Sequence, residues 1–548
     1  MRRSTLLLSS LSAAVLISGA ALAQEFQISE ARMNEDTRIL ASDEFEGRGV
    51  ATPGEQRTIE YIAQQFAAAG LQPGGVDGTW YQPVTLRRFE TSNASGALSV
   101  GDWTLPLHQG EEAVFSTRRP AEHVHLEDAE LVFVGYGINA PERDWNDFKG
   151  MDLRGKVLVV LVNDADFEEP ELDTFGGRAM TYYGRWTYKY EEAARQGAAG
   201  VLIVHETAPA SYGWNTVRNS WSQPQFDIVR ANPEAERIPL EGWIQLDVAR
   251  QLFQRAGLDF DALKAQARSR DFRPVTLEGA QLDAMMDVST ETVETRNVVA
   301  RLEGSTHPEE SILYMAHWDH LGVGEPDADG DAIFNGAVDN ATGIATLLEI
   351  ARAFAAGPRP ERSIVFLALT AEESGLLGAE YYGANPLYPL ETTVAGINMD
   401  AMGVWGPTRD LSVIGWGQSD LDQRLERLAA SQDRTISPDS TPEAGFFFRS
   451  DHFPMAKRGV PMAYAGSGDV LVEGGREAAA AASAAYTRDR YHQVNDEWSP
   501  DWNLGGMAQD AELFWRMGLE LANSRDWPRW AATSEFGPAR TASDDRRR

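Results

Sequence analysis

The sequence contains no cysteine among its 548 residues, and basic side chains are scarce relative to acidic ones. Without cysteine there is no disulfide framework and no thiol for lipid attachment. The 49 Lys and Arg face 82 Asp and Glu, which gives a net charge of −33 at pH 7. This excess of negative charge disfavours nucleic acid and anionic membrane surfaces as partners. Long apolar runs are also missing beyond the N-terminal segment, so we expect no membrane span there.

The first residues, MRRSTLLLSSLSAAVLISGAALAQE, have the pattern of an export signal. Arg2 and Arg3 form a basic start, an apolar stretch follows, and the small residues Ala21 and Ala23 flank Leu22 as in a cleavage site. The alternative is an uncleaved membrane anchor, but the apolar stretch is short and rich in Ala and Ser. We expect cleavage near Ala23 and a soluble mature protein in the periplasm or outside the cell.

The length is too great for one simple core and predicts an insertion or a second domain. Short β-rich runs and irregular segments containing Trp and Pro mark residues 120–275 as an inserted domain. From residue 297 onward, apolar strands alternate with helices, which is typical of a sheet covered on both faces. The expected segments are a signal peptide at 1–23, a main domain at 24–119 and 276–530, the insertion at 120–275, and a frayed polar tail at 531–548.

Side chains that bind metals follow several successive strands and turns of the main domain. Sites in open α/β sheets form outside the carboxyl ends of the strands. Singly, each residue has an ordinary explanation, such as a helix cap for an aspartate or a favourable first helical turn for paired glutamates. Their recurrence instead predicts a hydrolytic two-metal site, which needs imidazole and carboxylate ligands and a free carboxylate as base. The residues are His317, Asp319, Asp339, Glu372, Glu373, Asp400 and His492.

Six segments containing these residues resemble, in order, the signature segments of the M28 family of zinc peptidases. The stretch LASDEFEGRGVATPGEQRTIEYIAQQF also resembles the N-terminal segment of that family, and the insertion resembles a protease-associated (PA) domain. The resemblance implies an α/β fold with a mixed, mostly parallel sheet sandwiched by helices and an inserted, β-rich α+β PA-like domain. The six segments are AHWDHLG, NGAVDNATGIATLLE, ALTAEESGLLGAEYY, INMDAMG, FRSDHFP and YHQVND.

The resemblance also implies two zinc ions per chain and a peptide substrate. His317 and Asp400 would hold one zinc, Glu373 and His492 the other, and Asp339 would bridge both.

Asp319 would accept a hydrogen bond from the far ring nitrogen of His317, and Glu372 would act as general base and then general acid. The peptide bond between Asp339 and Asn340 is expected to be cis.

Some relatives carry a tyrosine just ahead of SDH, whereas this chain has FFFRSDH. A phenol from that position is therefore absent. Phe447 and Phe448 are candidates for an apolar substrate pocket, with a core role as an equal alternative. Arg449 is a candidate to meet a substrate carboxylate, with a structural ion pair as its alternative.

The leading hypothesis is an exported aminopeptidase. A carboxypeptidase or dipeptidase with the same chemistry is the near alternative, and Arg449 favours it. A non-catalytic receptor on this scaffold is a second class, opposed by the full ligand set. A glutaminyl-cyclase-like acyltransferase is a third, opposed by the PA-like insertion.

Overall fold

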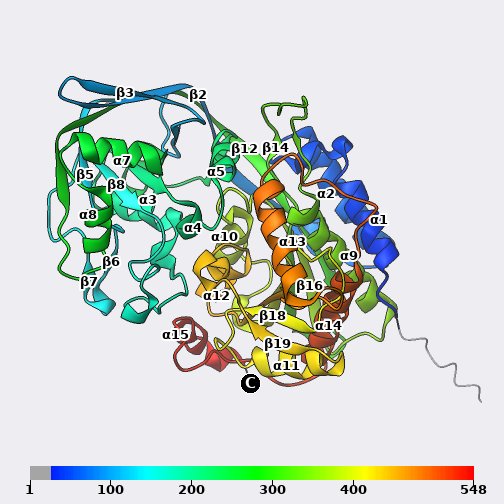
Figure 1. Ribbon diagram of the computed structural model, residues 1–548. Helices are drawn as coiled ribbons and strands as arrows, with labels where there is room; N and C mark the ends of the chain where they lie inside the picture. Colours follow the sequence, from blue (N-terminus) through cyan, green and yellow to red (C-terminus); the bar gives the residue numbers. More distant parts are fainter. Residues whose placement is uncertain (1–25, 548) are drawn as a thin grey trace, which may run out of the picture.

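The computed structural model describes residues 26–547, so the expected signal peptide lies outside the described residues. Figure 1 shows two bodies, with the long strands β2 (Tyr81–Val100) and β12 (Val275–Leu302) running from one to the other. These strands pair with each other antiparallel along nearly their whole length, with one bulge between Met285 and Asp287. Within the described residues no helix is both long and apolar enough to cross a membrane.

The main body contains the predicted mixed, mostly parallel sheet. Strands β16, β13, β17 and β20 pair parallel in that spatial order, while β12 and β18 join antiparallel on either side and β19 pairs parallel with β18. Parallel strands direct their carboxyl ends to one edge, where the predicted ligands begin. The bounds are β13 His307–His317, β16 Arg362–Leu369, β17 Thr393–Asn398, β18 Asp410–Ile414, β19 Thr435–Pro438 and β20 Met462–Ser467.

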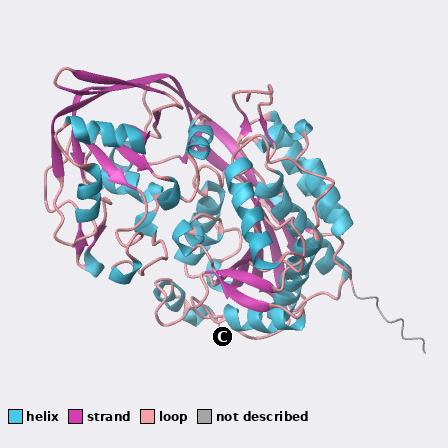
Figure 2. Ribbon diagram, viewed as in Figure 1, coloured by secondary structure: helices cyan, strands magenta, loops and turns pink. Residues whose placement is uncertain are grey.

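Helices cover both faces of this sheet, as Figure 2 shows. Successive side chains of a strand point to opposite faces. Along β13, Ile312 and Tyr314 pack into one core, while Leu313 and Met315 pack into the other. The sandwich predicted from the apolar strands is thus confirmed. The main helices are α1 Glu30–Leu40, α2 Pro53–Ala69, α9 Thr342–Ala356, α10 Leu377–Ala384, α11 Leu421–Ser431, α12 His452–Lys457, α13 Gly475–Asp489 and α14 Gly505–Ala522.

The second body has its own hydrophobic cores. One of them contains Phe89, Leu98 and Val288, so it takes in side chains on both sides of the expected 120–275 insertion. Four of its strands, β5, β8, β9 and β11, pair parallel in that order. The bounds are β3 Trp103–His108, β4 Ala113–Ser116, β5 His123–Phe133, β8 Val157–Leu161, β9 Gly200–His205, β11 Leu240–Gln245, α3 Trp186–Arg195, α5 Trp214–Trp221, α7 Leu246–Arg255 and α8 Phe260–Gln266.

The segment 531–547, part of the expected frayed tail, is mostly exposed but is anchored to the main body by buried residues. Phe536 is buried against the rings of Trp530 and Phe447. Arg540, in the short helix α15 (Gly537–Thr541), is buried and donates to the carbonyl oxygens of Thr393 and Val394 at 2.9 and 3.1 Å. These carbonyls lie at the start of β17, so the guanidinium fastens the C-terminal segment to the main sheet.

Candidate metal centre

The predicted ligands converge at the carboxyl edge of the main sheet. His317 is the last residue of β13, Glu373 lies in the turn after β16, and Asp400 follows β17 by two residues. Asp339 lies in the turn that leads into α9. Two clusters with metal-ligand geometry form here, and Asp339 belongs to both. They are His317 with Asp339 and Asp400, and His320 with Asp339 and Glu373.

The first cluster is built around the Nε2 atom of His317. This atom lies 3.3 Å from Asp339 Oδ1 and 3.3 Å from Asp400 Oδ1. The far side of Asp400 is fixed, because Ser450 Oγ donates to its Oδ2 at 2.6 Å. One imidazole nitrogen and two carboxylate oxygens therefore point at a common centre, which is a donor set that zinc accepts.

The second cluster surrounds Glu373. Its Oε2 lies 3.1 Å from His492 Nε2, which is also 3.5 Å from Asp339 Oδ2. Its Oε1 lies 2.6 Å from Nδ1 of His320, a residue that the sequence analysis did not select. The buried Nε2 of His320 has no hydrogen-bond partner within residues 26–547. The cluster of His320, Asp339 and Glu373 thus offers one imidazole nitrogen and two carboxylates, a donor set that fits a divalent cation.

Asp319 shapes this centre differently from our expectation. The Nδ1 atom of His317 is 3.2 Å from the backbone oxygen of Asp319 and 3.8 Å from its carboxylate. The hydrogen bond that fixes the ring is thus made by the carbonyl oxygen. The carboxylate accepts instead from the backbone N–H groups of Glu372 and Glu373, at 3.1 and 3.4 Å. It holds the turn that presents both glutamates.

Two further side chains hold the turn containing Asp339. Asp496 accepts from the N–H groups of Val338 and Asp339 at 3.2 and 3.1 Å. The buried Arg48 donates to the carbonyl oxygens of Trp318 and Gly336 at 2.8 and 2.7 Å. The cis peptide expected between Asp339 and Asn340 is confirmed.

The centre carries more carboxylates than imidazoles, and most of them are buried. Burial, with the negative charges of Asp400 and Glu373, raises the pKa of Glu372 well above its ordinary value. Burial opposes ionisation of Glu373 too, but the neighbouring His492 and His320 lower its pKa to about 2. Concentrated, buried negative charge is costly unless a cation compensates it. The residues therefore fit divalent cations.

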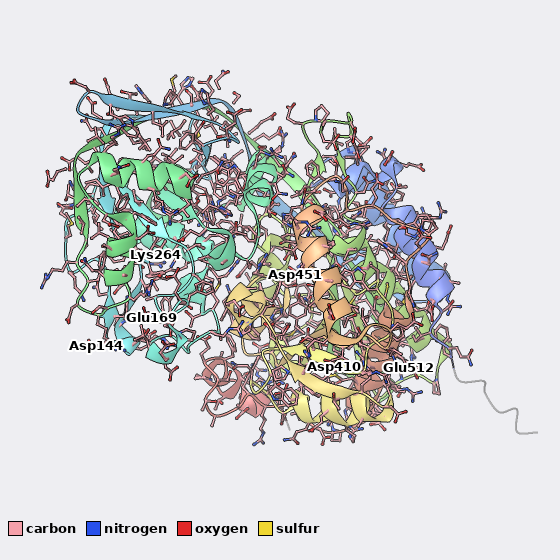
Figure 3. The ribbon with its side chains drawn as sticks, viewed as in Figure 1. Asp144, Glu169, Lys264, Asp410, Asp451 and Glu512 are labelled. Atoms are coloured by element: carbon pink, nitrogen blue, oxygen red, sulfur yellow. The ribbon has the colours of Figure 1, made fainter. Side chains whose placement is uncertain are left out.

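Asp451, which Figure 3 labels, immediately precedes α12 and interacts electrostatically with His317 and Asp319 of this centre. Burial raises the pKa of its carboxyl, whose oxygens have no hydrogen-bond partner in the described part of the chain.

A cavity of about 410 Å³ opens onto the centre and is lined by Asp339, Glu372, Asp400 and His492. Among the described residues Glu372 bonds to Asp319 through its backbone N–H and not through its side chain, so its carboxyl group is available to a molecule in the cavity that it lines. Tyr464 of β20 also lines the wall, and burial raises the pKa of its hydroxyl well above the ordinary value.

Of the three residues predicted to bind substrate, two line the cavity and one does not. Phe448 and Arg449 line the cavity, but Phe447 does not. Its ring packs against His452 and Phe536, with centroids 4.9 and 5.7 Å away. The three phenylalanines form a single 3₁₀ turn, Phe446–Phe448, whose successive side chains point in different directions.

The second body completes the cavity. Ser220 Oγ, on α5, lies 2.8 Å from Nδ1 of His492, and Asn219 Nδ2 donates to the carbonyl oxygen of His492 at 2.9 Å. Arg185, Tyr182 and Ser220 line the wall from this side. No local motif surrounds these residues, so the sequence alone gives no signal for them.

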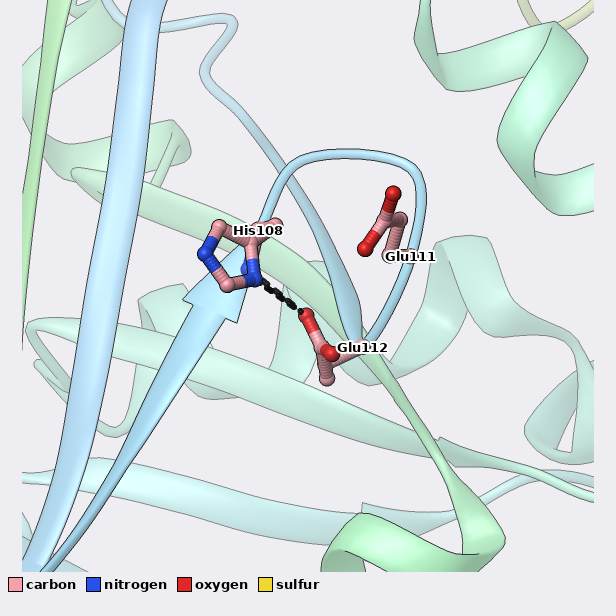
Figure 4. Close-up of side chains that lie close together, drawn as sticks. All are labelled: His108, Glu111 and Glu112. Carbon is pink, nitrogen blue, oxygen red and sulfur yellow. Dashed lines mark hydrogen bonds and ion pairs between the residues drawn. The ribbon is translucent and has the colours of Figure 1, made fainter.

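A separate cluster of His108, Glu111 and Glu112 lies in the second body (Figure 4). Nδ1 of His108 is 2.9 Å from Oε2 of Glu112, and the group is largely exposed. This pair is a solvated surface interaction and gives no evidence of a site.

The chain is similar in sequence to known metal-dependent peptidases. Residues 297–514 match the model of peptidase family M28. A probable zinc metalloprotease of Pyrenophora teres f. teres is 40% identical over 111 residues, covering 20% of this chain and 23% of that protein. Aminopeptidase NAALADL1 of Mus musculus is 33% identical over 302 residues, covering 45% of this chain and 38% of that protein. The chain thus spans about a quarter of the length of the probable zinc metalloproteases that it matches.

Two solved structures share the fold over nearly their whole length. An aminopeptidase from Aneurinibacillus sp. strain AM-1 gives a TM-score of 0.54 at 20% identity, covering 91% of this chain and 96% of that chain. BSAP, a zinc aminopeptidase from Bacillus subtilis, gives 0.50 at 16% identity, covering 94% and 98%. At these identities the likeness establishes the architecture.

Proposed function

We propose that the protein is an exported di-zinc aminopeptidase, starting from the match of residues 297–514 to the model of peptidase family M28. The observation that carries the proposal is the position of Asp339, which is shared by two ligand clusters at the floor of a cavity. The resemblance of the insertion to a PA domain and the export signal remain predictions from the sequence.

His317 and Asp400 would hold one zinc, Glu373 and His492 the second, and Asp339 both. This assignment is supported by the Nε2 atoms of both histidines, which face the carboxylates at 3.1–3.5 Å. His320 would orient Glu373 through its bond to Oε1. When bound, zinc supplies Lewis acidity, which polarises a peptide carbonyl and acidifies water.

The residues of the chain then perform the proton transfers. The Glu372 carboxylate lines the cavity, so it can take a proton from water and return it to the departing amine. Tyr464, protonated and on the same wall, is the phenol that we assign to donate a hydrogen bond to the carbonyl oxygen. It would replace the tyrosine that is absent ahead of SDH.

The test compares release of a chromogenic amine from a free amino acid and from its N-acetylated counterpart. The zinc-loaded enzyme should cleave only the free form appreciably, because an aminopeptidase recognises the α-amine. Equal rates on both substrates would rule out the aminopeptidase assignment, because the enzyme would then not require the free α-amine. The Glu372→Gln variant serves as the control for contaminating activity.

A further inference from the structure

Two arginines in the cavity wall have no acidic partner among the described residues, although the chain carries a net charge of −33 at pH 7. The wall contains Arg118, Arg185, Arg230, Arg237 and Arg449. Three of these are neutralised: Arg118 by Glu241 at 2.9 Å, and Arg230 and Arg237 by the shared Asp227 at 2.7 and 2.8 Å. Neither Arg185 nor Arg449 forms an ion pair with any residue between 26 and 547.

Arg449 is held rigidly by neutral groups. Its Nη1 donates to Ser211 Oγ at 3.0 Å, and its Nη2 donates to the hydroxyl of Tyr491 at 2.9 Å. Its guanidinium also lies 5.3 Å from the ring centre of Tyr212 and 5.1 Å from that of Phe446. These contacts fix the position of the group without cancelling its charge.

Arg185, which immediately precedes α3 in the second body, has fewer hydrogen-bond partners than Arg449 among the described residues. Its Nε is buried without a hydrogen-bond partner in the described chain. Burial, followed by the positive charge of Arg449, lowers the pKa of Arg185 to about 10, so the side chain is still charged at neutral pH. The two positive charges repel each other because burial limits their screening by water. A bound anion would offset this repulsion and accept a hydrogen bond from the unpartnered Nε of Arg185.

We propose that Arg185 and Arg449 together bind a carboxylate of the substrate, which makes the enzyme selective for short peptides with a negative charge near the scissile bond. This proposal rests on the peptidase function proposed above. Guanidinium groups bind carboxylates through paired, charge-assisted hydrogen bonds. The same cavity of about 410 Å³ contains both arginines and the metal-ligating residues, so the bound carboxylate and the reacting bond must belong to one small molecule.

The carboxylate could be the α-carboxylate of a dipeptide or an acidic side chain, and a set of three ligands separates these sources. Ala-Gln carries only an α-carboxylate, Ala-Glu-amide carries only a side-chain carboxylate, and Ala-Gln-amide carries neither. Their dissociation constants are measured by calorimetry on the zinc-loaded Glu372→Gln variant, in which hydrolysis does not remove the ligand.

At least one charged ligand should bind about 10- to 100-fold more tightly than Ala-Gln-amide, the range expected for a charge-assisted bond to a fixed arginine. Adding Arg185→Gln or Arg449→Gln should abolish that preference, and Arg185→Lys should restore only part of it because lysine lacks the planar fork. The matched control is Lys457→Gln, which removes a cation from the same wall that is already paired with Glu380.

Equal affinity for all three ligands, or an unchanged preference after Arg185→Gln, would overturn the carboxylate site. Hydrolysis of the same peptides by the unmodified enzyme is measured in parallel. Hydrolysis without a preference refutes the carboxylate site and leaves the peptidase intact. A binding preference without hydrolysis refutes the peptidase and leaves the anion site standing.

Discussion

Replacing Ser220 by alanine removes one hydrogen bond that joins the second body to the candidate metal centre. Ser220 Oγ lies 2.8 Å from Nδ1 of His492, whose opposite nitrogen faces Glu373 and Asp339. If Nε2 binds zinc, Nδ1 carries the ring proton and donates it to the serine oxygen. The bond therefore sets both the tautomer and the orientation of the ring.

The expected loss of zinc affinity depends on which contacts still hold His492 after Ser220 is replaced. Removing the hydrogen-bond partner of a metal-ligating histidine typically lowers metal affinity about 10- to 100-fold, or about 1.4–2.7 kcal/mol. Here Asn219 still holds the backbone oxygen of His492 at 2.9 Å, and the ring of Tyr491 still lies over the imidazole at a centroid distance of 4.0 Å. We therefore expect a loss near the lower end, about tenfold.

Zinc affinity is measured by competition with a chromophoric chelator, and the two binding steps are fitted separately. Ser220→Ala should weaken the step assigned to His492 and leave the step assigned to His317 unchanged. Ser222→Ala is the matched control, since Ser222 lies just beyond α5, is exposed, and bonds only to the carbonyl oxygen of Arg218. Unchanged affinity in Ser220→Ala, or an equal loss in Ser222→Ala, would refute the assignment of a positioning role to Ser220.

Four other substitutions test the remaining parts of the centre. Glu372→Gln should retain both zinc ions by elemental analysis but lower kcat by about 10²- to 10⁴-fold, so wild-type turnover in the metal-replete variant would contradict its role. Asp339→Ala should lose zinc and melt at a lower temperature, because the shared ligand orders both sites; two zinc ions per chain in that variant would exclude a bridge. Tyr464→Phe should lower kcat with little change in KM, and an effect on KM alone would indicate only substrate binding. Arg48→Met should reduce the free energy of unfolding by about 3 kcal/mol or more, measured in urea, because it leaves several buried carbonyl oxygens without a donor.

The proximity of the proposed ligands could be predicted because the carboxyl ends of parallel strands meet at one edge of the sheet. His317 and Asp400 end or follow neighbouring strands, so their proximity follows from sheet topology once the strands are recognised. The same logic did not reveal His320. It lies in the same HWDH motif, but spacing alone does not tell which of two histidines in a turn faces the acids.

Other differences arise from tertiary contacts that leave no local pattern. Ser220 reaches His492 from 272 positions away, across the boundary between the bodies. Phe447 could not be separated from Phe448 by composition, because both rings pack against one core from a single tight turn and only Phe448 also lines the cavity. The polar composition of the C-terminal segment predicted a frayed tail. In the structure Arg540 donates hydrogen bonds to backbone carbonyl oxygens at the start of β17.

The cavity depends on contact between the two bodies, and this explains why the main sheet alone does not make a complete site. The main body supplies every assigned zinc ligand, but the second body supplies Arg185 and the hydrogen bonds to His492. The boundary is fastened nearby, because Asn163 Nδ2 donates to Glu443 O at 3.0 Å and Met180 N donates to Pro442 O at 2.9 Å. Arg449 extends this chain of contacts from Ser211 in the second body to Tyr491, the residue that precedes His492. A shift of one body against the other would therefore disturb the proposed carboxylate site and the orientation of His492, a proposed zinc ligand, together.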